Sequence, residues 1–76
     1  MAVKRYAVCL ANDFGPDFDG GDVFPGMSYV CLGEEGSLLR IVDESGEDYL
    51  YPTAAFLVLS EEDSRKLELS LARLAA

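Results

Sequence analysis

Short runs in which apolar and polar residues alternate fill most of the first 59 positions, and glycine, proline and acidic residues separate them. Runs of this length with turn residues between them predict β-strands. We place five strands, at residues 4–11, 28–32, 38–42, 48–51 and 56–59. A loop rich in Gly, Pro and Asp, residues 13–26, joins the first two strands, and tight turns at 33–36 and 43–47 join the next three.

The turn at residues 43–47 reads Asp-Glu-Ser-Gly-Glu. Its Ser45-Gly46 pair supplies the residue with positive φ that a hairpin needs, and β-branched and aromatic residues flank it. We interpret its acids as exposed hairpin residues rather than a general acid and base pair, because catalytic carboxylates need burial to separate their pKa values. Pro52 then ends the fourth strand, and residues 52–56 predict a 3₁₀ turn.

The last segment, residues 60–76, predicts a helix that opens at Ser60, a good N-cap followed by three acids. Leu67, Leu71 and Leu74 recur at i, i+4 and i+7, so they share one face, which we expect to pack on the strands or on a partner. A second strip of Leu69, Ala72 and Ala76 indicates either a dimer seam or a fraying end. The chain is thus a single domain, with β-structure over 1–59 and a helix over 60–76 packed on it.

The chain has 76 residues, half of them hydrophobic, with fourteen acids against six bases and a formal charge of −8. Nucleic acids and anionic membranes bind through Lys and Arg, so we expect neither direct nucleic-acid binding nor membrane binding. A basic protein segment fits the sign of the charge, although the acids also serve solubility. So short a chain leaves little room for a deep pocket, and we expect no enzymatic activity.

Two cysteines, Cys9 and Cys31, each lie inside an apolar run, which predicts buried thiols rather than a disulfide. The N-terminal apolar run is interrupted by Asn12 and Asp13, too early for a signal-peptide core or a membrane span. We therefore expect a cytoplasmic protein.

The candidate binding residues are acidic and aromatic, and lie on the long loop and the fourth strand. They are Asp13, Phe14, Asp17, Phe18, Asp19, Asp22, Tyr49 and Tyr51. Carboxylates beside aromatic rings can hold an Arg or Lys side chain through ion pairs and cation–π contacts. The alternative is that Phe14, Phe18 and Tyr51 simply close the core.

The acids at residues 17–22 also suggest a calcium loop, but the spacing departs from that pattern. The glycine expected at the sixth position is Asp22, and the bidentate Glu expected at the twelfth is Ser28. Two thiols without any histidine cannot complete a zinc site. We therefore expect no metal and no cofactor.

Three short motifs resemble the small barrel of the Src-homology-3 type. They are Leu-Ala-Asn-Asp-Phe at 10–14, Gly-Ser-Leu-Leu-Arg at 36–40 and Leu-Tyr-Pro-Thr-Ala-Ala-Phe at 50–56. With the long first loop, the two hairpins and the 3₁₀ turn, this resemblance implies a mainly β fold: a five-stranded Src-homology-3-like barrel followed by a C-terminal α-helix.

Some residues of this chain differ from the Src-homology-3 pattern, and the differences concern peptide binding. Signalling domains of the family bind proline-rich peptides on a groove of aromatic rings. Here Asn12, Leu38 and Ala55 stand where the resemblance places groove rings. The hairpin at 41–52 is also similar to hairpins of small uncharacterised bacterial proteins, which implies a bacterial or phage origin.

Two functional hypotheses follow. The first is a protein-interaction module that binds a basic protein segment through the acidic loop and hairpin face, as a monomer or as a weak homodimer through the C-terminal helix. The second is an inhibitor or decoy that mimics nucleic-acid charge, which requires carboxylates spread along one edge.

Overall fold

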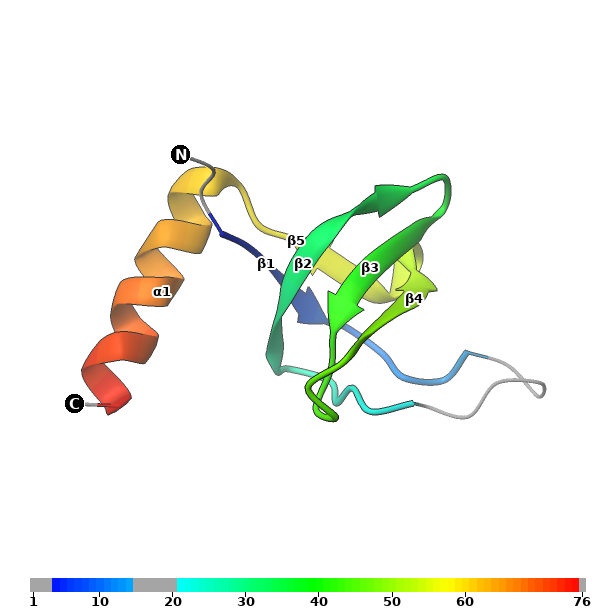
Figure 1. Cartoon of the computed structure of the whole chain (residues 1–76), viewed down its shortest axis with the longest axis horizontal. Helices are drawn as coiled ribbons and strands as arrows, with labels where there is room; N and C mark the ends of the chain where they lie inside the picture. The colour runs from blue at the N-terminus through cyan, green and yellow to red at the C-terminus, as the bar shows by residue number, and fades with distance from the viewer. Residues whose placement is uncertain (1–3, 15–20, 76) are drawn as a thin grey trace.

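The computed structural model describes residues 4–14 and 21–75, with the side chain of Ala75 left aside. It contains five strands, β1 (Arg5–Cys9), β2 (Ser28–Glu35), β3 (Leu38–Val42), β4 (Asp48–Pro52) and β5 (Phe56–Val58). A 3₁₀ turn, η1 (Thr53–Ala55), precedes β5, and the helix α1 (Glu61–Ala75) follows it. The mainly β class, the 3₁₀ turn and the C-terminal helix are confirmed (Figure 1).

All strand pairs are antiparallel and form one open sheet in the order β4-β3-β2-β1-β5. Pro52 ends β4 at an edge of the sheet, where its missing N–H interrupts no ladder between two neighbours. Within the described residues, no helix has both the length and the hydropathy to cross a lipid bilayer.

The turn predicted at residues 33–36 is wrong, because β2 continues through Gly33 to Glu35. The register between β2 and β3 shifts between Cys31 and Gly33, so Leu32 is the extra residue of a β-bulge. Pairing resumes with Gly33 opposite Arg40, and the chain reverses only at 36–37, where Gly36 has a φ of 63°.

One face of the sheet carries the hydrophobic core. Its buried members are Ala7, Cys9, Val23, Tyr29, Cys31, Leu39, Ile41, Tyr51, Ala55 and Phe56. Both cysteines are buried free thiols, as predicted, and burial raises the pKa of Cys9. Val23 fills this core from the long loop, which ties the second half of that loop to the sheet.

The helix begins as predicted. The Ser60 hydroxyl accepts a hydrogen bond from the Asp63 N–H at 3.1 Å, which caps the helix N-terminus. Its contact with the sheet is made by Ser64, which is fully buried and whose hydroxyl accepts a 3.0 Å hydrogen bond from the N–H of Tyr6 on β1.

The sheet covers only one of the three residues of the predicted leucine face. Leu67 is partly buried, but Leu71 is 39% exposed and Leu74 is 82% exposed. Figure 1 shows the reason: the helix meets the sheet at its N-terminal end, and its later turns stand apart. Packing of this face on a partner stays a prediction.

Candidate binding site

The turn between β3 and β4 is the hairpin that the sequence predicts. The Gly46 N–H donates to the Asp43 carbonyl at 3.0 Å, and the Asp43 N–H donates to the Glu47 carbonyl at 3.1 Å. Gly46 has a φ of 85°, so it supplies the positive φ. The Asp43 side chain also accepts hydrogen bonds from the backbone N–H and the hydroxyl of Ser45. This carboxylate therefore stabilises the turn from within.

Asp43 corrects the expectation that the acids of this turn are exposed. Glu44 and Glu47 are exposed, but Asp43 is only 6% exposed and accepts a 2.7 Å hydrogen bond from the Tyr51 hydroxyl. Burial by itself raises the pKa of Asp43, but the hydrogen bonds from Ser45 and Tyr51 outweigh it and hold the pKa below its ordinary value. Asp43 is therefore a buried, ionised carboxylate.

Tyr51 is the partner that makes this burial tolerable. Burial and the hydrogen bond to Asp43 raise the pKa of Tyr51 to about 12, so the phenol stays protonated and donates. Its ring packs in the core with ring centroids 5.8 Å from both Phe14 and Phe56. Its hydroxyl oxygen also accepts from the Asp22 N–H at 3.3 Å.

The end of the long loop is fixed against this hairpin. The Glu44 N–H donates to the Asp22 carbonyl at 2.9 Å. Gly21 is required here, because its φ is 60° and a Cβ at this position would lie 2.7 Å from the Tyr51 hydroxyl oxygen. Asp22, Asp43, Glu44 and the start of β4 are thereby held at one end of the molecule.

Between the loop and β4 lies a hollow of about 280 Å³, which we call the acidic hollow. It is lined by Gly21, Asp22, Asp43, Tyr49, Leu50 and Tyr51. Half of the Tyr49 surface is exposed, and its hydroxyl donates to Glu47 at 2.8 Å, which raises the pKa of Tyr49. The hollow thus presents an aromatic ring bordered by carboxylates.

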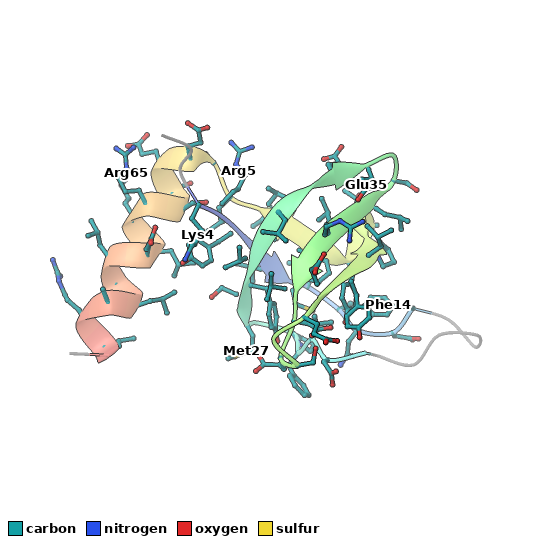
Figure 2. All side chains as sticks on the ribbon, viewed as in Figure 1. Lys4, Arg5, Phe14, Met27, Glu35 and Arg65 are labelled. Atoms are coloured by element: carbon teal, nitrogen blue, oxygen red, sulfur yellow. The ribbon has the colours of Figure 1, made fainter. Side chains whose placement is uncertain are left out.

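The bases of the chain lie elsewhere. Five of the six are at residues 4–5 and 65–73, whereas ten of the fourteen acids fall within residues 6–60. Figure 2 shows Lys4, Arg5 and Arg65 beside the N-terminal end of the helix, with Phe14 on the far side of the sheet. The sixth base, Arg40, forms ion pairs with Glu35 at 2.8 Å and Asp48 at 2.9 Å. Of the described acids, Asp22, Asp43, Glu44 and Glu47 lie at the loop and hairpin end, and none of them is paired with Arg40, so this end carries an excess of negative charge.

A second, larger hollow of about 530 Å³ lies at the start of β1 and the bulge of β2. Lys4 and Arg5 line it together with Leu32, Glu34 and Glu61. Its mixture of both charge signs gives it no preference for a cation.

The structure brings three of the predicted binding residues together, since Asp22, Tyr49 and Tyr51 all line the acidic hollow. Tyr51 is only 3% exposed and Phe14 packs on it, which agrees with the alternative that these two rings complete the core. Asp13 is exposed on the first part of the loop. The remaining three, Asp17, Phe18 and Asp19, lie outside the described residues.

Two residues of this region escaped the sequence analysis. Tyr29 is buried, and its hydroxyl accepts from the Phe24 N–H at 2.9 Å and donates to a Glu44 carboxylate oxygen at 2.8 Å. Burial and the bond to Glu44 raise the pKa of Tyr29 to about 12. Phe24 is more than half exposed beside it. The Pro25-Gly26 pair after Phe24 was the available signal, since it marks a turn that presents its flanking side chains.

No group of three or more Cys, Asp or Glu side chains that could hold a metal ion occurs in the part of the chain that the structure describes. Comparisons with protein-family models, with curated proteins and with solved structures gave no match.

Proposed function

We propose that the chain is a small interaction module with a Src-homology-3-like barrel, and that it binds a basic segment of another protein at the acidic hollow. The long loop between β1 and β2, the two hairpins and η1 before β5 support the fold part of this proposal. The functional part depends on the hollow itself.

The observation that carries the proposal is the half-exposed ring of Tyr49 beside the carboxylates of Asp22 and Glu47. A Lys or Arg side chain on this ring gains a cation–π contact of about 0.5–1 kcal/mol at an exposed site. Ion pairs with surface carboxylates add about 0.2–1 kcal/mol each. Such sums give weak, salt-sensitive binding of one cation, so a useful affinity needs several bases in one segment.

The state of Asp43 supports a binding role rather than a catalytic one. A general acid at neutral pH needs a raised pKa, whereas the hydrogen bonds from Ser45 and Tyr51 lower the pKa of Asp43 against the effect of burial. An ionised Asp43 beneath the hollow adds instead to the attraction for a cation.

A fluorescent peptide of alternating Arg and Gly tests the proposal, with fluorescence anisotropy measured at 50 and 300 mM salt. We expect binding that weakens at least tenfold over this range. The double variant Asp22→Asn/Glu47→Gln should weaken it at least fivefold at 50 mM salt, and Tyr49→Ala should weaken it further because the ring is lost.

The matched control is Glu61→Gln/Glu62→Gln, which removes the same charge from the exposed first turn of the helix. We expect less than a twofold change for this control. Equal losses in the two double variants would show that only the net charge matters, and would refute a site at the hollow.

A further inference from the structure

Two exposed apolar side chains lie in the turn that closely follows Asp22 of the acidic hollow. Phe24-Pro25-Gly26-Met27 forms a β-turn in which the Met27 N–H donates to the Phe24 carbonyl at 3.1 Å and Gly26 has a φ of 85°. The two ends of such a turn lie within about 7 Å of each other. Phe24 and Met27 each expose more than half of their surface.

The end of β1 holds this turn in place. The Cys9 N–H donates to the Met27 carbonyl at 2.9 Å, and the Gly26 N–H donates to the Cys9 carbonyl at 2.8 Å, so the turn is held against the end of β1. We call Phe24 and Met27 the turn patch; Figure 2 shows Met27 at the end of β2 away from Glu35.

Two carboxylates lie near Phe24. Asp22 and Phe24, on either side of the fully buried Val23, are both exposed. Tyr29 joins the Phe24 N–H to the Glu44 carboxylate through hydrogen bonds of 2.9 and 2.8 Å. The turn patch and the acidic hollow are therefore adjacent parts of one surface.

The fold itself does not account for these apolar side chains. The turn requires Pro25 and Gly26, but it makes no demand for Phe or Met on either side of them. Single exposed apolar residues are normal on protein surfaces, whereas a group of them marks an interaction site. Exposed Met and aromatic side chains beside acids suit a ligand that is both apolar and basic, because Met adapts its shape to the partner.

We propose that the partner segment is amphipathic: its bases bind at Asp22, Glu44 and the acidic hollow, and its apolar side chains cover the turn patch. This inference rests on the proposed function and names the chemistry of the partner. An anionic lipid surface does not fit, because the carboxylates that border the patch repel it.

Two synthetic peptides of fourteen residues and equal positive charge test the inference. One combines Lys with Leu at spacings of three and four, and the other replaces each Leu with Ser. We expect the Lys/Leu peptide to bind at least tenfold more tightly in fluorescence anisotropy. The double variant Phe24→Ser/Met27→Ser should reduce this advantage to less than threefold, with circular dichroism confirming that the fold is kept.

The control variant, Leu69→Ser/Leu74→Ser, removes two exposed leucines from the helix and should keep the full advantage of the Lys/Leu peptide. Equal, salt-sensitive binding of both peptides would overturn the inference and leave the proposed function standing. Binding of neither peptide would overturn both. The chain could instead self-associate at low salt, and the Phe24→Ser/Met27→Ser variant could abolish this self-association. That result would identify the occupant as a second copy of this chain and would also overturn the inference.

Discussion

The substitution Tyr51→Phe isolates the bond between Tyr51 and the buried Asp43 carboxylate. It keeps the ring that packs against Phe14 and Phe56, and it removes the hydroxyl that donates to Asp43 at 2.7 Å. The same change takes an acceptor from the Asp22 N–H, a longer contact of 3.3 Å.

The expected loss of stability is large because the acceptor, the Asp43 carboxylate, is charged. A hydrogen bond to an ionised group contributes about 1.5–3 kcal/mol, and Asp43 would keep only its bonds to Ser45. We expect the free energy of unfolding to fall by about 2 kcal/mol at pH 7. This is a large part of the stability of a small domain, which is about 5 kcal/mol at the lower end of the usual range.

The pH dependence has a definite sign. The pKa of Asp43 in the folded chain lies below its ordinary value, because the hydrogen bonds from Ser45 and Tyr51 outweigh burial. The unfolded state therefore takes up the proton first, and the stability that Asp43 supplies is present above about pH 4 and is lost as the pH falls below it. The difference in the free energy of unfolding between wild type and Tyr51→Phe should become smaller as the pH falls below about 4.

Urea denaturation followed by circular dichroism measures both effects at a series of pH values from 7 towards 2. Tyr49→Phe is the control, because it removes a hydroxyl two residues away that donates to the exposed Glu47. We expect its denaturation midpoint to stay near that of the wild type. A Tyr51→Phe variant as stable as Tyr49→Phe at pH 7, or a loss of stability that stays the same in acid, would refute the stabilising role of the Tyr51–Asp43 hydrogen bond.

Three further predictions follow from the same contacts. Gly36→Ala should lower the free energy of unfolding by about 1 kcal/mol, because the position has a positive φ. Gly21→Ala should lower it further in urea denaturation, because its Cβ would also lie 2.7 Å from the Tyr51 hydroxyl oxygen. Burial raises the pKa of Tyr29 and Tyr51 to about 12, so in the folded chain each phenol keeps its proton at a pH where the unfolded chain has lost it. The free energy of unfolding should therefore fall by about 2–3 kcal/mol for each tyrosine between pH 10 and 12. Phenolate absorbance at 295 nm should rise later in the folded chain than in the unfolded chain. Leu74→Ser should leave the urea denaturation midpoint unchanged, because this side chain is 82% exposed. A clearly lower midpoint would show that the end of the helix packs on the sheet.

The strands were predictable because their signal is local. Alternation places β3 at its observed bounds and starts β2 at Ser28. The end of β2 was not predictable, because Gly33 to Gly36 has the composition of a turn. What keeps Gly33 and Glu34 in the sheet is their pairing with Arg40 and Leu39 across the bulge, a contact between strands that composition does not encode.

The helix illustrates a different limit. The spacing of its leucines predicts an apolar face, but spacing does not tell what covers that face. The hydrogen bond to the sheet is made by Ser64, which accepts from the Tyr6 N–H 58 residues earlier in the chain. A serine in the first turns of a helix carries no signal of burial, so this contact required the structure.

Asp43 was misjudged for a similar reason. A polar tip in a hairpin is normally exposed, and the sequence around Asp43 offers no local sign of anything else. Its burial depends on Tyr51 beneath it and on the loop that reaches the hairpin through the Glu44–Asp22 backbone bond. The candidate site was accordingly only half predictable: Asp22 and Tyr49 by composition, but not Phe24 or Tyr29.

The distribution of charge argues that the acids do more than keep the domain soluble. Solubility is served by acids and bases mixed over the surface, yet residues 6–60 hold ten acids and a single base, Arg40, whose guanidinium is already paired with Glu35 and Asp48. The other five bases lie near the helix. With the basic partner proposed above, a molecule divided in this way would turn its acidic end towards that partner before contact, which would raise the association rate more than it slows dissociation. Charge at the loop and hairpin should therefore govern how fast a partner arrives, and the turn patch beside it how long the partner stays.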